Sequence, residues 1–257
     1  MRFVKTGLAC AALALLAAPS AHAQGWGNVK GQVTWGGGAV PAREKLDVNK
    51  DQEACLKKGP LFSEKYVINP KNKGVRWVLV WLTDAESPNK ALPVHPALKA
   101  IAKKTVEIDQ PCCMFEPHVL GIREGQELVF KNSAGIAHNV KVDGGAKGPN
   151  INPILPPGGT VKVADVEARK FPIPVSCSIH PWMKSYVGVF KGPYFAVTDE
   201  NGHFEIKNAP AGKFRLMAWQ EEQGWVAGDG GKPSGKGQLI EIKPGDTTEV
   251  KLEVKPS

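Results

Sequence analysis

The fold of this chain is best predicted from one stretch, Cys177-Ser178-Ile179-His180-Pro181-Trp182-Met183. Its spacing places a thiol, an imidazole and a thioether within seven residues, which favours a tight turn between two strands. A fourth donor is His138, which follows a strand-like run at 127–132 and lies in a second one at 137–142. Two imidazoles and a thiolate with a weak axial thioether suit one copper ion. The sequence therefore predicts a single copper site.

The ligand loop Cys-x₂-His-Pro-x-Met makes residues 106–190 resemble the blue-copper cupredoxins, and the loop is most similar to that of amicyanin. The resemblance implies one type 1 copper per chain, with Asn139 bracing the ligand loop near Ser178. Ile179 stands where amicyanin-like loops often carry proline, and it keeps a backbone N–H that could donate to the Cys177 sulfur. The copper ligands that the resemblance implies are His138, Cys177, His180 and Met183.

A structural cysteine is the alternative interpretation of Cys177. A buried cysteine usually acts as a small hydrophobic residue, and a Cys-x₂-His pair is common by chance. His138 on a neighbouring strand and Met183 three residues beyond His180 favour copper over this alternative.

The N-terminal residues 1–23 have the pattern of a secretory signal peptide. Arg2 and Lys5 precede an apolar run at 7–18, and residues 21–23 form an A-x-A cleavage site. No other run approaches the ~18 apolar residues needed to cross a bilayer. We therefore expect an exported protein without a membrane span, in a compartment that permits disulfides, best matched by the bacterial periplasm.

The charge of the mature chain is moderately positive. Removal of Arg2 and Lys5 from 33 basic residues leaves 31 against 25 acidic ones, a net charge of +6. The lysines are scattered along the chain, which argues against nucleic-acid binding, and most should lie on a solvated surface. The excess charge favours acidic partners through electrostatic steering.

Short apolar runs between Gly- and Pro-rich turns are typical of an all-β chain. We expect strands at 28–35 and 75–82, the second buried on both faces because it alternates little. Residues 194–206 predict a hairpin that turns at Asn201-Gly202. Residues 96–104 form the only convincing helix, and 42–72 is polar and irregular.

A second resemblance concerns the C-terminal part. Thr198-Asp199-x-x-Gly202-x-Phe204, followed by a proline–glycine turn and a strand, resembles the carboxypeptidase regulatory-like domain, a transthyretin-like sandwich. We expect an all-β fold in which a Greek-key cupredoxin sandwich is lodged inside a discontinuous small β-sandwich. The expected divisions are 1–23 signal peptide, 24–84 first part of the small sandwich, 85–104 linker with a short helix, 105–191 cupredoxin and 192–257 second part of the small sandwich.

Three cysteines remain in the mature chain if Cys177 binds copper, so one disulfide is possible. Cys55–Cys113 is the preferred pair and Cys55–Cys112 the alternative, because adjacent cysteines rarely bridge each other. Either bridge would close a loop of roughly 60 residues, worth about 4 kcal/mol in the chain-entropy account.

A second metal site is conceivable at Cys112, Met114 and His118, since thiolate and thioether suit Cu(I) and alternate residues of a strand share a face. The alternative is a disulfide, a buried methionine and a capping histidine, and we favour it. His203 follows a turn and is expected to be an exposed structural residue.

The favoured function is single-electron transfer in the periplasm. We expect the His180 edge to reach the surface, with a c-type cytochrome or a periplasmic dehydrogenase as partner. A copper enzyme is disfavoured because the chain has no His-x-His pair and no second cysteine in the ligand loop. The alternative is a copper-carrying protein or chaperone, or a non-redox binding module of the cell envelope. The docking patch that we expect around His180 consists of Ile179, Pro181, Trp182 and Lys184.

Overall fold

The computed structural model describes residues 25–255. The predicted signal peptide lies outside the described residues. The described part is almost entirely β, and its helices are short: α1 (Gln52–Cys55), η1 (Pro96–Lys103), η2 (Gly145–Lys147) and η3 (Asp229–Gly231). None of these helices is long and apolar enough to cross a membrane.

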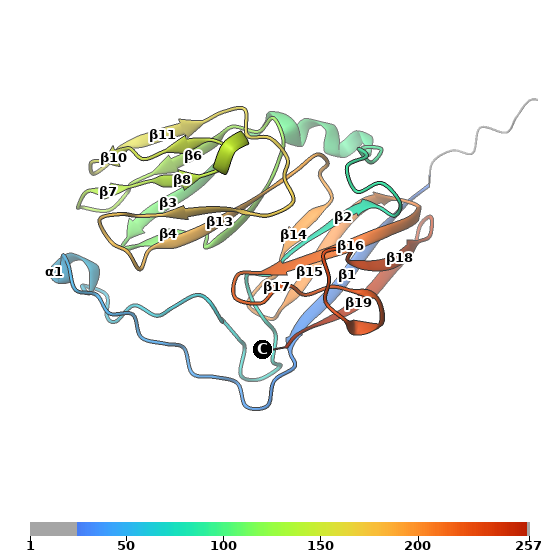
Figure 1. Ribbon diagram of the computed structural model, residues 1–257, viewed down its shortest axis with the longest axis horizontal. Helices are drawn as coiled ribbons and strands as arrows, with labels where there is room; N and C mark the ends of the chain where they lie inside the picture. The colour runs from blue at the N-terminus through green and yellow to red at the C-terminus, as the bar shows by residue number, and fades with distance from the viewer. Residues whose placement is uncertain (1–24, 256–257) are drawn as a thin grey trace, which may run out of the picture.

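Two groups of sheets lie beside each other along the long axis (Figure 1). We call the first the outer sandwich. It consists of two sheets. The first has the strand order β15-β1-β19, and the second has the order β14-β2-β16-β17, with β18 hydrogen-bonded to β16 as well. Its strands are β1 (Trp26–Trp35), β2 (Leu79–Asp84), β14 (Phe195–Val197), β15 (His203–Pro210), β16 (Gly212–Gln220), β17 (Gly224–Trp225), β18 (Gln238–Ile242) and β19 (Thr247–Val254).

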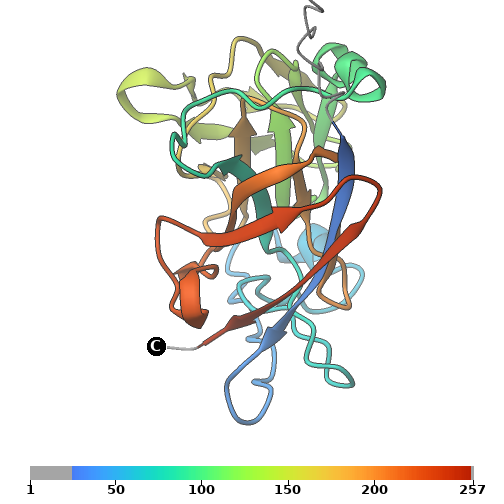
Figure 2. The same cartoon turned by 90° about the vertical axis from the view of Figure 1, so that its right-hand side faces the viewer.

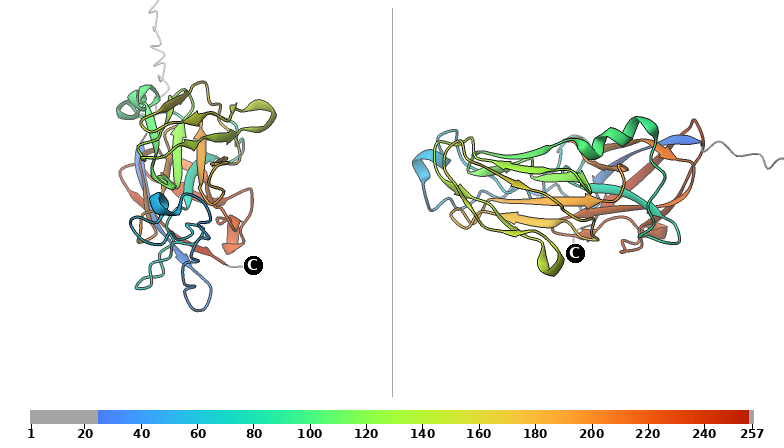
Figure 3. Two further views of the ribbon diagram at one scale, coloured as in Figure 1. Left: turned by 90° about the vertical axis from the view of Figure 1, so that its left-hand side faces the viewer. Right: turned by 90° about the horizontal axis from the view of Figure 1, so that it is seen from above.

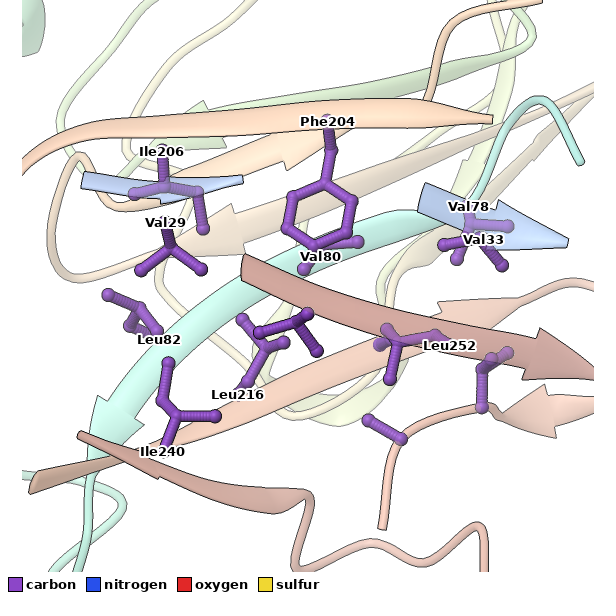
Figure 4. Packing of buried hydrophobic residues seen from close by; sticks show 14 of the residues in the cluster. Val29, Val33, Val78, Val80, Leu82, Phe204, Ile206, Leu216, Ile240 and Leu252 are labelled. Atoms are coloured by element: carbon purple, nitrogen blue, oxygen red, sulfur yellow. The ribbon is translucent and has the colours of Figure 1, made fainter. Parts of the chain in front are cut away.

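The outer sandwich is closed by the two ends of the described chain. β1 runs parallel to β19, from Asn28 opposite Thr247 to Trp35 opposite Val254, and Figure 2 shows these strands side by side. Apolar residues that alternate along β1, such as Val29 and Val33, face a shared core with residues of β2, β15 and β16. Figure 4 shows this core, in which Phe204 and Leu216 approach from opposite sheets.

The inner sandwich contains residues 106–190. Its sheets have the orders β11-β6-β3-β4 and β5-β13-β12-β8-β9, with a small β10-β7 ladder beside them. Its core includes Ile108, Phe115, Phe130 and Val187. Its strands are β3 (Val106–Cys112), β4 (Met114–Glu116), β5 (Val119–Arg123), β6 (Leu128–Lys131), β7 (His138–Asn139), β8 (Lys141–Asp143), β9 (Asn150–Ile151), β10 (Ile154–Leu155), β11 (Thr160–Val163), β12 (Ile173–Ser176) and β13 (Lys184–Phe190).

The all-β fold class is the predicted one, and the expected divisions at 84, 104 and 191 fall between strands. The expected burial of β2 on both faces is confirmed. Val80 and Leu82 belong to the core of the outer sandwich, whereas Leu79 and Trp81 belong to a third cluster. That cluster joins β2 and β16 to Val119 and Phe190 of the inner sandwich, so β2 lies between two apolar layers.

The connection from β1 to β2 leaves the outer sandwich and reaches the far end of the inner one, where α1 lies (Figure 1). Figure 3 shows the same arrangement from above, with α1 at the end of the molecule opposite the outer sandwich. Val48 and Cys55 are buried in the inner core, and Leu46, Leu56 and Leu61 pack against it. The segment called polar and irregular from its sequence is therefore anchored to the inner sandwich by its few apolar residues.

One local prediction was wrong. The Asn201-Gly202 turn forms, with Gly202 at φ 74°, but its flanking strands are not a hairpin. β14 pairs with β2 and β15 pairs with β1, so this turn carries the chain from one sheet of the outer sandwich to the other. The expected helix at 96–104 is confirmed as η1, a 3₁₀ helix whose first turn is capped by the His95 side chain, which accepts from Ala97 N.

Candidate metal centre

The seven-residue loop 177–183 joins two paired strands. β12 and β13 are antiparallel, with Ser176 opposite Lys184, and the loop begins and ends directly beyond that pair. Two backbone hydrogen bonds close it, from Cys177 N to Met183 O and from Met183 N to His180 O. The chain therefore turns tightly enough to bring Cys177, His180 and Met183 to one end of the inner sandwich.

His138 meets this loop from β7. Its Nδ1 lies 2.9 Å from Nδ1 of His180, which in turn lies 3.8 Å from the Cys177 sulfur. One donor atom from each of these three residues lies within 4.8 Å of the others. Cys177 is 2% exposed, and His138, His180 and Met183 are 0% exposed. The structure thus brings the sequence-predicted residues together in a buried cluster.

The His138 imidazole is held in its neutral form. Burial, followed by the neighbouring His180, lowers its pKa to about 4, against smaller opposing effects of Asp51 and the Cys112 backbone. Its Nε2 is buried without a hydrogen-bond partner among residues 25–255. A metal ion needs a neutral imidazole with a free lone pair, and this ring supplies one at neutral pH.

Asn139 ties the His138 strand to the ligand loop. Its backbone N–H donates to the Cys177 sulfur at 3.4 Å, and its side-chain oxygen accepts from Ser178 N. The contact between Asn139 and Ser178 is the one that we expected from the sequence. The side-chain amide also donates to Asn152, and the Asn139 carbonyl accepts from the buried Gln110 at 3.2 Å. Because Asn139 is bonded on every side, His138 and Cys177 are held in fixed relative positions.

Asp51 is a member of the site that sequence reasoning missed. Its Oδ2 accepts a hydrogen bond from His180 Nε2 at 2.8 Å. With Nε2 donating to this carboxylate, Nδ1 of a neutral His180 presents its lone pair toward His138 and Cys177. Asp51 thus fixes the tautomer and the orientation that a metal ligand requires. It adopts a left-handed conformation, with φ 49°, immediately before α1.

A disulfide holds Asp51 in place. Cys55, at the end of α1, is bonded to Cys113, which confirms the preferred pairing and leaves Cys112 as a free thiol. The two sulfurs and a ring nitrogen of His180 lie within 4.8 Å of one another. Trp182 donates its indole N–H to Cys113 O at 3.1 Å, so the ligand loop is also fastened to the bridge. The predicted Cys55–Cys113 pairing was the one sequence signal that could have placed the segment around Asp51 beside the ligand loop.

The expected surface exposure of the His180 edge was wrong. The ring is 0% exposed because Asp51, α1 and the disulfide lie over it, whereas the Asp51 side chain is 41% exposed. Of the expected docking patch, Pro181 and Lys184 are exposed and Ile179 and Trp182 are half-buried. We call the segment 46–61 the cap, since it covers the ligand that was expected at the surface.

The other sequence candidates do not form a second metal site. Cys112 and Met114 face each other across the β3–β4 turn, while His118 is engaged elsewhere. Its Nε2 lies 2.5 Å from Glu221 and its Nδ1 3.0 Å from the Lys184 carbonyl. Among the described residues, no metal-binding group of His, Cys, Asp and Glu contains Cys112 or His118. His203 is exposed, as expected.

His118 instead forms a buried hydrogen-bonded pair with Glu221 between the two sandwiches. The side chains of His118 and Glu221 are each 4% exposed, and Glu64 lies 3.5 Å from the other ring nitrogen. Burial lowers the pKa of His118, but the hydrogen bond and charge of Glu221 outweigh it, so the pKa is raised overall. These contacts of His118 link the cap-bearing connection, β4–β5 and the end of β16.

The donor set of the site fits copper. Cys177 offers a soft sulfur, two imidazoles lie beside it, and Met183 is buried in the same cluster as Cys177. Thiolate, imidazole and thioether together select copper rather than a hard cation, which would need oxygen ligands. Of the nearby carboxylates, Asp51 is directed at the distal nitrogen of His180 and not at the cluster itself.

No family model matches this sequence, and no curated protein matches it. Several solved structures match part of it. A purple cupredoxin from Nitrosopumilus maritimus is 23% identical, with 33% of this chain covering 98% of that one at a TM-score of 0.28. A mutant of amicyanin with Cu(I) is 18% identical, and the match covers 42% of this chain and 91% of that one at a TM-score of 0.30. A copper-containing nitrite reductase from Thermus scotoductus SA-01 is 23% identical, and the match covers 38% of this chain and 27% of that one at a TM-score of 0.31. At these TM-scores the likeness assigns neither a family nor a function.

Proposed function

We propose that this chain is a single-electron carrier with one type 1 copper ion held by His138, Cys177, His180 and Met183. The observation that carries the proposal is the convergence of two imidazoles on one thiol in a buried, hydrogen-bonded cluster. Bound there, copper would supply one-electron redox chemistry. The remaining features of the proposal concern what the chain's own residues do.

The protein holds its ligands in a rigid arrangement. Cys177 accepts from Asn139 N, His180 is fixed by Asp51, and the loop is tied to the Cys55–Cys113 bridge through Trp182. Ligands restrained in this way cannot rearrange much between two oxidation states. Restraint favours electron transfer because little reorganisation is needed when charge changes.

The same restraint argues against the alternative of a copper chaperone. Delivery of a metal ion requires ligands that an acceptor protein can reach, whereas all four proposed ligands are at most 2% exposed. We propose no catalytic role, since four protein donors leave no open position for a substrate.

Electrons would enter through the cap and not at a bare histidine edge. His180 is buried, but its hydrogen-bond partner Asp51 is 41% exposed, so the ring lies one side chain beneath the surface. Lys50, Lys57 and Lys58 are exposed on the cap, and Lys184 is exposed at the start of β13. The cap also exposes Asp47, Asp51 and Glu53, so Lys184 and the net positive charge of the chain would steer an acidic partner more than the cap itself. A c-type cytochrome or a periplasmic dehydrogenase remains our proposal for that partner, in a periplasmic setting.

The test is a redox titration of the copper-loaded chain together with metal analysis. We expect one copper per chain and a reversible one-electron transition, with copper retained after reduction in the presence of a Cu(I) chelator. Rapid loss of Cu(I) to the chelator would support the carrier or chaperone alternative. Failure to take up copper would contradict both.

A further inference from the structure

A cavity of about 300 Å³ lies at the junction of the two sandwiches. Its walls come from β2 and the loop after it, the segment before β12, the end of β13, and the strands β16 and β17. None of the four proposed copper ligands lines it. Ligand sites commonly occur at such interfaces and have volumes that begin near this value, about 300 Å³.

One wall of the cavity is a contiguous row of aromatic rings. Trp225 lies 5.9 Å from Trp81, and Trp81 lies 5.1 Å from Phe190, measured between ring centroids. Phe171, which is 52% exposed, extends the row at 5.2 Å from Trp225. Because much of the Phe171 ring is still in contact with water, a flat apolar molecule that covers it would gain free energy from the burial of apolar surface.

The cavity is also strongly basic. Its lining contains no aspartate or glutamate, and it contains Lys90, Arg169, Lys170, Lys191 and Lys236. Lys90 is paired with Asp84 at 3.1 Å, but Lys170 and Lys236 have no ion-pair partner within the described chain. Lys170 instead lies over two rings of the aromatic row, 5.5 Å from Phe171 and 5.7 Å from Trp225. Unpaired cations beside aromatic rings attract an anion that also carries an apolar body.

A polar group in the lining lacks a partner. The Thr83 hydroxyl is buried and has no hydrogen-bond partner among residues 25–255. A buried hydroxyl without a partner costs free energy, which a bound acceptor atom would recover. Thr83 lies on β2 two residues beyond Trp81, and alternate residues of a strand share a face. The hydroxyl is therefore on the same face of β2 as the aromatic wall.

We propose that this cavity binds a small amphipathic anion, a flat aromatic ring system that carries one carboxylate, sulfonate or phosphate group. The ring system lies against Trp81 and Trp225, and the anionic group faces Lys170 and Lys236. The Thr83 hydroxyl donates to an oxygen or other acceptor atom of the ligand. This site is separate from the proposed copper site and does not depend on it.

The test uses two fluorescent probes that share one ring system. The first is 8-anilinonaphthalene-1-sulfonate, and the second is N-phenyl-1-naphthylamine, which lacks the sulfonate. Both are titrated into the full chain, the Lys170→Gln and Lys236→Gln variants, and a control, Lys251→Gln. The control makes the same change at an exposed position on β19, which is not part of the cavity lining.

We expect the anionic probe to bind with one site and to weaken about threefold to fivefold in each cavity variant, the range of a partly exposed ion pair. Rising salt should weaken it further. The neutral probe should bind less tightly than the anionic one, and equally to the full chain and to every lysine variant. Trp225→Leu should weaken both probes, because it removes the aromatic wall. The proposal is overturned if the Lys170→Gln/Lys236→Gln double variant binds the anionic probe as the control does. It is also overturned if the neutral probe binds as tightly as the anionic one.

Discussion

Replacing Asp51 by asparagine should raise the reduction potential of the copper-loaded protein. The substitution keeps the size of the side chain and removes one negative charge beside His180, whose Nε2 donates to the carboxylate at 2.8 Å. A carboxylate near the site stabilises the more highly charged Cu(II) form, and it also makes the imidazole a better donor. Losing it disfavours Cu(II) on both counts, so both effects act in the same direction.

The size of the effect follows from Coulomb's law. Adding the imidazole ring and a metal–nitrogen bond of about 2 Å to the hydrogen bond puts the carboxylate charge about 6–7 Å from a bound ion. With an effective dielectric constant of about 20, one unit charge at that distance is worth about 2.5 kcal/mol. The Asp51 side chain is 41% exposed, so solvent screening reduces this to about 1–2 kcal/mol. For a one-electron couple that corresponds to a rise of about 40–90 mV.

The potential is measured by titrating the oxidised protein with a reductant while following its visible charge-transfer band. The matched control is Asp47→Asn, which removes the same charge from an exposed position in the same segment. A shift in Asp51→Asn no larger than in the control would refute the reasoning. So would a downward shift, because it would mean that the carboxylate does not act on His180.

Four further outcomes are expected. Cys177→Ser should lose the charge-transfer band yet keep its far-ultraviolet circular dichroism, since one buried sulfur carries the colour; a variant that stays blue would contradict the ligand assignment. Met183→Leu should still bind copper but at a higher potential, because the axial bond is weak; complete loss of binding in metal analysis would speak against it. Cys55→Ser with Cys113→Ser should lose about 4 kcal/mol of unfolding free energy in urea titrations, the entropy of a loop closed across a separation of 58 residues; an unchanged midpoint would show that the apolar contacts of the cap suffice. Because the pKa of His118 is raised in the folded protein, protonation of His118 contributes stability that is complete below about pH 6.5 and is lost as pH rises through the folded pKa. His118→Asn should remove this decrease in unfolding free energy. If urea titrations across pH 6–9 show an equal decrease in the variant, the decrease belongs to another group.

The ligand loop could be predicted from the sequence because its chemistry is local. Cys177, His180 and Met183 lie within seven residues, and a loop that joins two adjacent strands has few ways to arrange them. His138 could also be predicted as a ligand, because it lies in the strand-like run 137–142 that directly follows the run 127–132. The disulfide was also predictable in outline, although only the structure distinguished Cys113 from Cys112.

Asp51 could not be predicted because nothing in its neighbourhood has a regular pattern. α1 is only four residues long, and the apolar residues that anchor the cap, such as Val48 and Leu56, are separated by charged and polar ones. The contact with His180 joins residues 129 positions apart, so it depends on the bridge from Cys55 and not on local sequence. A prediction of an exposed histidine edge followed naturally from the loop alone and failed for that reason.

The supposed hairpin at 194–206 shows a different limit. The Asp199–His203 turn is fixed by local contacts, since the Asp199 carboxylate accepts from the backbone N–H groups of Asn201 and His203. Those contacts determine where the chain reverses, but they do not choose the partner of each strand. β15 finds its partner in β1 and β14 finds its partner in β2, both far away in the sequence.

The central claim is that Cys177, His138, His180 and Met183 hold one copper ion, and the most direct measurement is the visible absorption spectrum during stepwise addition of Cu(II). The account predicts an intense thiolate-to-copper band that grows linearly and stops at one equivalent per chain. The same band should be lost on reduction and return on reoxidation. A titration that reaches one bound equivalent without such a band would contradict the account, because it would place the copper away from the Cys177 sulfur.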